Sequence, residues 1–150
     1  MICCPVCDSR FDPSKPGKPR SYAQHKRFFA LLKEVLHHWP EKHDWQFANR
    51  HELRAWLTVK AGWRELKSQT PIVGAKPELV RSIVEGALRA VRSFAIPFVV
   101  GDCLQIWAPK SINYKTLSHQ DACRLFDEVA IVIERETGLR AEQLLGEQAA

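Results

Sequence analysis

The most specific chemical signal in the sequence is Cys4-Pro5-Val6-Cys7, near the amino terminus. Two thiolates separated by two residues can both reach one tetrahedral zinc ion, so the spacing predicts half of a structural zinc site, with Cys4 and Cys7 as ligands. A structural zinc takes four ligands, and the sequence contains no second pair of this spacing. The motif therefore predicts zinc as a cofactor but does not define the rest of its site.

Several other residues could complete such a zinc site. The candidates are Cys3, His25, His37, His38, His43, Cys103, His119 and Cys123. A site shared between two chains also fits a single pair of cysteines. The alternative is a thiol tail without metal, since reducing compartments keep cysteines as thiols.

A second pattern, His37-His38 followed by Asn49 and His51, has the residue order of metal-dependent nucleases. Such enzymes place a general base beside metal ligands so that a water molecule can attack a phosphodiester. Asn49 and His51 lie only two residues apart, which is too close for that motif. We therefore favour helix-capping and solvated roles for these residues and keep a nuclease as an alternative.

Positive charge is concentrated in the first part of the chain. The net charge is +5, with seven Lys and Arg residues between Arg10 and Lys33. Residues 12–20 carry three prolines and a glycine, which favour an extended linker. We expect residues 1–19 to form a cysteine knuckle and linker, and residues 20–150 to form a single domain.

Helical periodicity predicts most of that domain. Ser21 begins a helix over residues 22–38, and Asn49 caps a second helix that ends near Gly62. A third helix is expected over residues 77–93, and Ser118 and Gly138 bound a long fourth one. A short helical turn is possible over residues 140–146.

Two short apolar runs, residues 96–100 and 103–107, are joined by Gly101-Asp102, which suits a two-residue hairpin turn. Residues 63–74 could form a strand or a loop. The sequence therefore predicts an α+β fold, mostly helical, with a β-hairpin or small antiparallel sheet and a short N-terminal cysteine knuckle.

Basic and polar residues predict an anion-binding surface. Lys26, Arg27 and Lys33 lie on the polar side of the first helix, and Lys110 and Lys115 flank Ser111. Such groups neutralise phosphates without reading sequence, although an ordinary solvated face is an equally good interpretation. Trp45 and Trp63 lie near expected helix ends and could act as stacking platforms for bases.

Three segments resemble a family of small uncharacterised phage and prophage proteins: residues 20–32, 53–62 and 109–127. More remotely, the pattern Arg-Ser-x-x-Gln before a hydrophobic helix is similar to the NinB (Orf) recombination mediators of lambda-like phages. That resemblance implies a dimeric α+β protein that binds single-stranded DNA and helps to load a recombinase. It implies DNA-binding roles for five residues: Arg20, Ser21, Gln24, Lys110 and Ser111.

These observations favour a non-catalytic phage protein that binds single-stranded or branched DNA in recombination or replication. Its possible partners include a host or phage recombination protein and a second copy of the chain. The alternatives are a phage factor that modulates a host protein and the nuclease. No apolar run approaches the roughly 20 residues of a membrane span, and no signal peptide is evident. We expect no membrane association and a location in the cytoplasm of a bacterial host.

Overall fold

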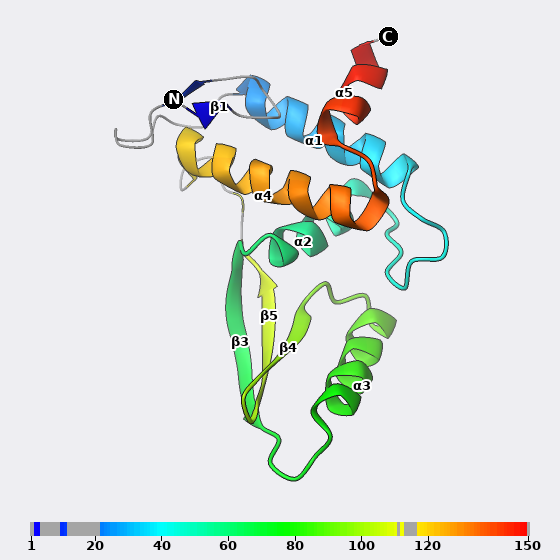
Figure 1. Cartoon of the computed structure of the whole chain (residues 1–150), viewed down its shortest axis with the longest axis vertical. Helices are drawn as coiled ribbons and strands as arrows, with labels where there is room; N and C mark the ends of the chain where they lie inside the picture. Colours follow the sequence, from blue (N-terminus) through cyan, green and yellow to red (C-terminus); the bar gives the residue numbers. More distant parts are fainter. Residues whose placement is uncertain (1, 4–9, 12–21, 111, 113–116, 150) are drawn as a thin grey trace.

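The computed structural model describes residues 2–3, 10–11, 22–110, 112 and 117–149, and it has the predicted α+β architecture (Figure 1). The helices are α1 (Tyr22–His37), α2 (Arg50–Lys60), α3 (Pro77–Ala90), α4 (His119–Thr137) and α5 (Ala141–Ala149). The strands are β1 (Ile2–Cys3), β2 (Arg10–Phe11), β3 (Arg64–Pro71), β4 (Ile96–Val100) and β5 (Cys103–Pro109). The prediction of a largely helical fold with a small antiparallel sheet is confirmed.

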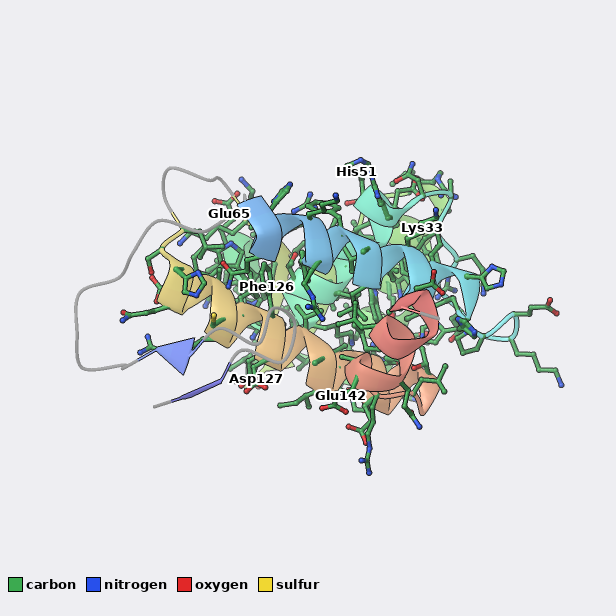
Figure 2. All side chains as sticks on the ribbon, turned by 90° about the horizontal axis from the view of Figure 1, so that it is seen from above. Lys33, His51, Glu65, Phe126, Asp127 and Glu142 are labelled. Atoms are coloured by element: carbon green, nitrogen blue, oxygen red, sulfur yellow. The ribbon has the colours of Figure 1, made fainter. Side chains whose placement is uncertain are left out.

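Helices α1, α4 and α5 form one layer, and α2 connects that layer to the sheet by contacting α1 and α4 on one side and β4 and β5 on the other. Phe126 lies between α1 and α4 in Figure 2, where its ring stacks on Phe28 with a centroid distance of 3.9 Å. Both rings are fully buried, together with Leu31 and Leu57. Burial of these side chains supplies the main driving force for assembling the helical layer.

The predicted helix boundaries follow from local capping chemistry. The Asn49 side chain accepts hydrogen bonds from the backbone amides of His51 and Glu52 at the start of α2. Ser118 accepts one from Asp121 at the start of α4, and Gly138 ends that helix with a left-handed φ of 75°. Each cap satisfies backbone groups that have no partner within the helix.

The sheet has the order β3-β5-β4, and both pairings are antiparallel. The expected hairpin is present, because β4 and β5 are joined at Gly101, whose φ is 60°. Residues 64–71, left open between strand and loop by the sequence, form β3 along the other side of β5. A bulge interrupts that pairing between Leu66 and Ser68.

Two helices differ in length from their predictions. Helix α3 ends at Ala90 rather than at Ser93, because Arg92 takes a left-handed φ of 56° that cannot continue a helix. The expected short turn after residue 140 is the nine-residue helix α5. Its Leu144 is fully buried in the core, which explains why the helix persists beyond one turn.

Near the amino terminus, β1 and β2 pair antiparallel, with Ile2 opposite Phe11 and Cys3 opposite Arg10. These short strands bracket Cys4 and Cys7 in the sequence, but both cysteines and the linker lie outside the described residues. Zinc binding by this motif stays a prediction. No helix within the described part of the chain is long and apolar enough to cross a membrane.

Candidate nucleic-acid interface

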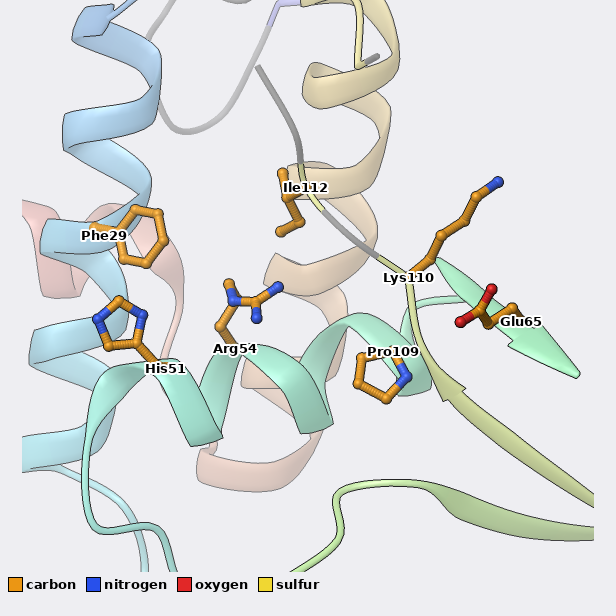
Figure 3. A pocket seen from close by; sticks show the side chains of 7 residues that line it. All are labelled: Phe29, His51, Arg54, Glu65, Pro109, Lys110 and Ile112. Atoms are coloured by element: carbon orange, nitrogen blue, oxygen red, sulfur yellow. The ribbon is translucent and has the colours of Figure 1, made fainter. Parts of the chain in front are cut away.

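Two adjoining depressions lie where α1, α2 and the end of β5 meet. The first, of about 510 Å³, is shown in Figure 3, and the second, of about 420 Å³, shares Phe29 and His51 with it. We call the combined feature the basic groove. It is lined by His25, Lys26, Phe29, Arg50, His51, Arg54, Glu65, Pro109, Lys110 and Ile112.

Arg54 lies at the centre of the first depression, on α2 between His51 and Pro109 (Figure 3). Its side chain is half-buried, and burial lowers the pKa of the guanidinium from its ordinary value. The guanidinium makes no hydrogen bond or ion pair with any residue that the structure describes. A partly desolvated cation without a counter-charge is an unfavourable arrangement that a bound anion would relieve.

Aromatic rings line the groove beside that cation. The Phe29 ring lies 4.6 Å from the His25 ring and 5.7 Å from the His51 ring, measured between centroids. The Arg50 guanidinium carbon lies 5.5 Å from the centre of the Phe29 ring, within the range of a cation–π contact. Phe29 therefore offers a half-buried π surface beside the Arg50 cation.

The far end of the groove contains one acidic residue, Glu65, which is already paired. Its carboxylate lies 2.8 Å from Lys67 Nζ. The hydrogen bond from Lys67 lowers the pKa of Glu65, with a smaller contribution from the charge of Lys110. Lys110 is exposed, and its ammonium lies 4.8 Å from the centre of the Trp63 ring. The groove thus keeps a clear excess of positive charge.

The opposite side of the helical layer is acidic. A separate depression there is lined by Asp127, Glu134 and Glu142 together with Arg140. In the view of Figure 2, His51 lies at one edge of the molecule, and Asp127 and Glu142 lie at the other. The two sides of the layer therefore differ in sign, which would orient an approaching polyanion toward the basic groove.

Eight of the nine predicted DNA-binding residues fall into three groups. Lys26 and Lys110 line the basic groove. Arg27 and Lys33 are exposed on α1 but lie outside it, with Lys33 in a separate depression beside His37. The third group, Arg20, Ser21, Ser111 and Lys115, lies outside the described residues.

Gln24, which the resemblance assigned to DNA contact, is fully buried instead. Its Nε2 donates a hydrogen bond to Cys123 Sγ at 3.0 Å across the interface of α1 and α4. A side chain in this position cannot reach a bound strand. We therefore assign Gln24 to helix packing and leave it out of the candidate interface.

Two tryptophans were predicted as stacking platforms. The prediction for Trp45 is wrong, because its side chain is only 3% exposed and packs against Trp56 and Phe94. Its position in the loop after α1 suggested exposure, but the loop folds back over the core. Trp63 is half-buried beside Lys110 at the end of the basic groove, so it keeps a partly accessible ring.

The His and Asn pattern is dispersed in the structure. Asn49 uses its side-chain oxygen to cap α2, and His51 lies in the basic groove rather than beside His37 or His38. Among the described residues, no three His, Cys, Asp or Glu side chains are grouped closely enough to hold a metal ion.

The sequence analysis missed Phe29, Arg50 and Arg54 as site residues. The spacing of Arg50 and Arg54, four residues apart on a helix, places both on the same face and could have indicated a basic stripe. Comparison of the chain with protein-family models, with curated proteins and with solved structures found no match.

Proposed function

We propose that this chain is a non-catalytic protein that binds single-stranded nucleic acid in the basic groove. The observation that carries the proposal is the half-buried Arg54 guanidinium, which has no acidic partner among the described residues and lies beside the rings of Phe29 and His51. A phosphate would supply the missing counter-charge, and an unpaired base would cover the aromatic surface.

Four permanent positive charges border the groove: Lys26, Arg50, Arg54 and Lys110. None of the four forms an ion pair within the described part of the chain, so each is available to neutralise a phosphate. Phosphate contacts of this kind position a strand without selecting its sequence. We therefore propose binding with little sequence preference and with strong dependence on salt.

The preference for single strands rests on Phe29. In a duplex the bases are stacked on each other and are not available to a protein ring, whereas an exposed base gains about 1–3 kcal/mol from an aromatic platform. The resemblance to recombination mediators favours DNA over RNA and supports a role in phage recombination or replication. The acidic side of the molecule would be turned away from the strand.

The test is fluorescence-anisotropy titration of a labelled thymidine oligonucleotide and of a duplex, at two salt concentrations and with a chelator present. With four phosphate contacts, the logarithm of the association constant should fall against the logarithm of salt concentration with a slope of about −3 for the single strand. The duplex should bind more weakly than the single strand at both salt concentrations.

Phe29→Leu separates stacking from charge, since leucine preserves the packing of this position but removes the ring. We expect the affinity for the single strand to fall about tenfold while the salt slope stays unchanged. Phe94→Leu is the matched control, because Phe94 is also half-buried but packs against Trp45 and Phe47, away from the groove. Absence of single-strand binding at low salt, or equal losses in both variants, would contradict the proposal.

A further inference from the structure

Exposed apolar side chains are concentrated in the half of the molecule formed by the sheet and α3. Of the seven large hydrophobic residues that are exposed in the described part of the chain, six lie between residues 66 and 100, and the other is Ile131 on α4. Val73, in the loop before α3, and Val91, directly after the helix, are 81% and 74% exposed. A concentration of this kind indicates a surface that is covered in the functional state.

Helix α3 has two apolar faces, and the fold covers only one of them. Val80, Val84 and Leu88 recur every four residues and are half-buried on the helix, which packs on β4. Glu85 accepts a hydrogen bond from Trp45, and Arg81 pairs with Glu85 along the helix. The remaining face carries Leu79, Ser82, Ile83, Gly86, Ala87 and Ala90, with no charged side chain. We call these six residues the outer face of α3.

The outer face has the shape of a helix–helix contact. Leu79, Ile83 and Ala87 form one row with a spacing of four residues, and Ser82, Gly86 and Ala90 form a parallel row of small residues beside it. Rows with this spacing are the ridges and grooves by which helices pack against each other. A surface helix that faces only water would normally carry polar residues here.

We propose that the outer face of α3 binds the same face of a second copy of this chain, with the two helices antiparallel. In a two-fold arrangement centred between Val84 and Glu85, Ile83 of one copy meets Gly86 of the other, and Leu79 meets Ala90. Every large residue of the outer face is then opposite a small one. The face is therefore complementary to itself, which an unrelated partner would not require.

Charge supports the same antiparallel arrangement. Glu78 lies in the first turn of α3, where it also pairs with Arg81, and Arg89 lies in the last turn. An antiparallel pair brings the acidic end of each helix to the basic end of the other, and it also aligns the two helix dipoles favourably. A parallel pair would bring like charges together at both ends.

The free edges of the sheet are less suitable places for self-association. On β3 the bulge at Lys67 interrupts regular hydrogen bonding, and Pro71 at its end has no amide to donate; on the other edge strand, β4, Pro97 also lacks an amide. Bulges, lysines and prolines are features that prevent edge strands from pairing with another chain. The outer face of α3 lacks such protection.

This proposal does not depend on nucleic-acid binding. Helix α3 lies at the opposite end of the molecule from α1 in Figure 1, so a contact between two copies leaves both basic grooves accessible. A pair of helices of this length buries less than a standard interface of about 1,600 Å². We therefore expect a dissociation constant of about 1–10 µM.

The test is sedimentation equilibrium of the full chain at about 100 µM and in high salt, which removes nucleic acid. The wild type should be a dimer, and Ile83→Glu should be a monomer, because it places a charge at the centre of the contact. Ala87→Arg should also be a monomer, and this variant removes no packing within the chain, because Ala87 is exposed. Circular dichroism will show that both variants are folded.

Ile131→Glu is the matched control. It replaces an apolar residue of similar exposure, 53% against 62% for Ile83, on a different helix. This variant should remain a dimer. A monomeric wild type at 100 µM, a dimeric Ala87→Arg variant, or an Ile131→Glu variant that dissociates as readily as Ile83→Glu would each overturn the proposal. A monomeric wild type would assign the outer face to a different protein.

Discussion

Trp45 Nε1 donates a hydrogen bond of 3.1 Å to Glu85 Oε1, which joins the loop after α1 to α3. Arg81, one turn earlier on α3, donates to the other oxygen of the same carboxylate at 2.8 Å. Apart from this contact, α3 packs mainly on β4, and none of its residues is fully buried. Glu85 is therefore a main polar connection between α3 and the helical layer.

Replacement of Glu85 by Leu should destabilise the protein by about 1–3 kcal/mol, because the Trp45 indole N–H would be left buried without an acceptor. Glu85→Gln should cost less, since its amide oxygen can still accept from Trp45. The measurement is the free energy of unfolding in urea. Glu78→Leu is the control: Glu78 also pairs with Arg81 but is largely exposed, so its loss should change stability by at most about 0.5 kcal/mol.

The same carboxylate makes stability depend on pH. Burial by itself raises the pKa of Glu85, but the hydrogen bonds from Trp45 and Arg81 outweigh it and hold the pKa below its ordinary value of 4.5. A folded-state pKa below the unfolded one adds stability at pH above about 4.5 and loses it as the pH falls through the folded value. The stability difference between wild type and Glu85→Gln should therefore shrink in acid, and a difference that grows in acid would contradict this account.

The local parts of the fold could be predicted because their signals lie within a few residues. The caps at Asn49 and Ser118 and the left-handed Gly138 were all identified from the sequence, and each is present. The strand β3 could not be assigned, because nearly all of its side chains are exposed on both faces, so it lacks alternating hydrophobicity. Its pairing with β5, about forty residues later, decides its conformation.

The candidate site was only partly predictable for a similar reason. Lys26 and Lys110 were identified from charge alone. The importance of Arg54 depends on its partial burial beside Phe29 and Ile112, which come from segments distant in the sequence. The burial of Gln24 could not be predicted for the same reason, because its hydrogen-bond partner Cys123 lies 99 residues away in the sequence.

Gln24 and Lys26 should respond oppositely to substitution, although they lie two residues apart on α1. Gln24→Ala removes the buried hydrogen bond to Cys123 and should lower the free energy of unfolding by about 1–2 kcal/mol without changing affinity for single-stranded DNA. Lys26→Ala should leave stability unchanged and weaken binding. Urea unfolding and anisotropy on both variants check this, and a binding defect in a folded Gln24→Ala protein would restore the role implied by the resemblance.

The cysteine motif predicts bound zinc. The zinc content of the purified protein can be measured directly by mass spectrometry. We expect one zinc ion per chain, or one per dimer if two chains share the site, and its loss in Cys4→Ser or Cys7→Ser. Cys103→Ser should keep the metal, because Cys103 is a half-buried thiol on β5 and, among the described residues, belongs to no group of three His, Cys, Asp or Glu side chains that could hold a metal ion. A metal-free wild type purified without chelator would remove zinc from the account.

Arg54→Met is the most direct test of the groove, because methionine preserves the apolar stem of the side chain and removes only the charged group. If Arg54 neutralises one phosphate, the salt slope for single-stranded DNA should become shallower by about 0.7, and affinity at low salt should fall about tenfold or more. Thermal stability should stay equal or rise, since a half-buried cation without a partner is removed.

Arg140→Met is the control for that variant. It also removes one positive charge, but Arg140 lies on the acidic side of the molecule, 3.7 Å from Glu134. Its effect on net charge is identical, so any contribution of overall charge to binding will be the same in both variants. If a phosphate binds at Arg54, the salt slope of DNA binding should become shallower in Arg54→Met and stay unchanged in Arg140→Met. An equal change of the salt slope in both variants would mean that DNA binding depends on net charge alone.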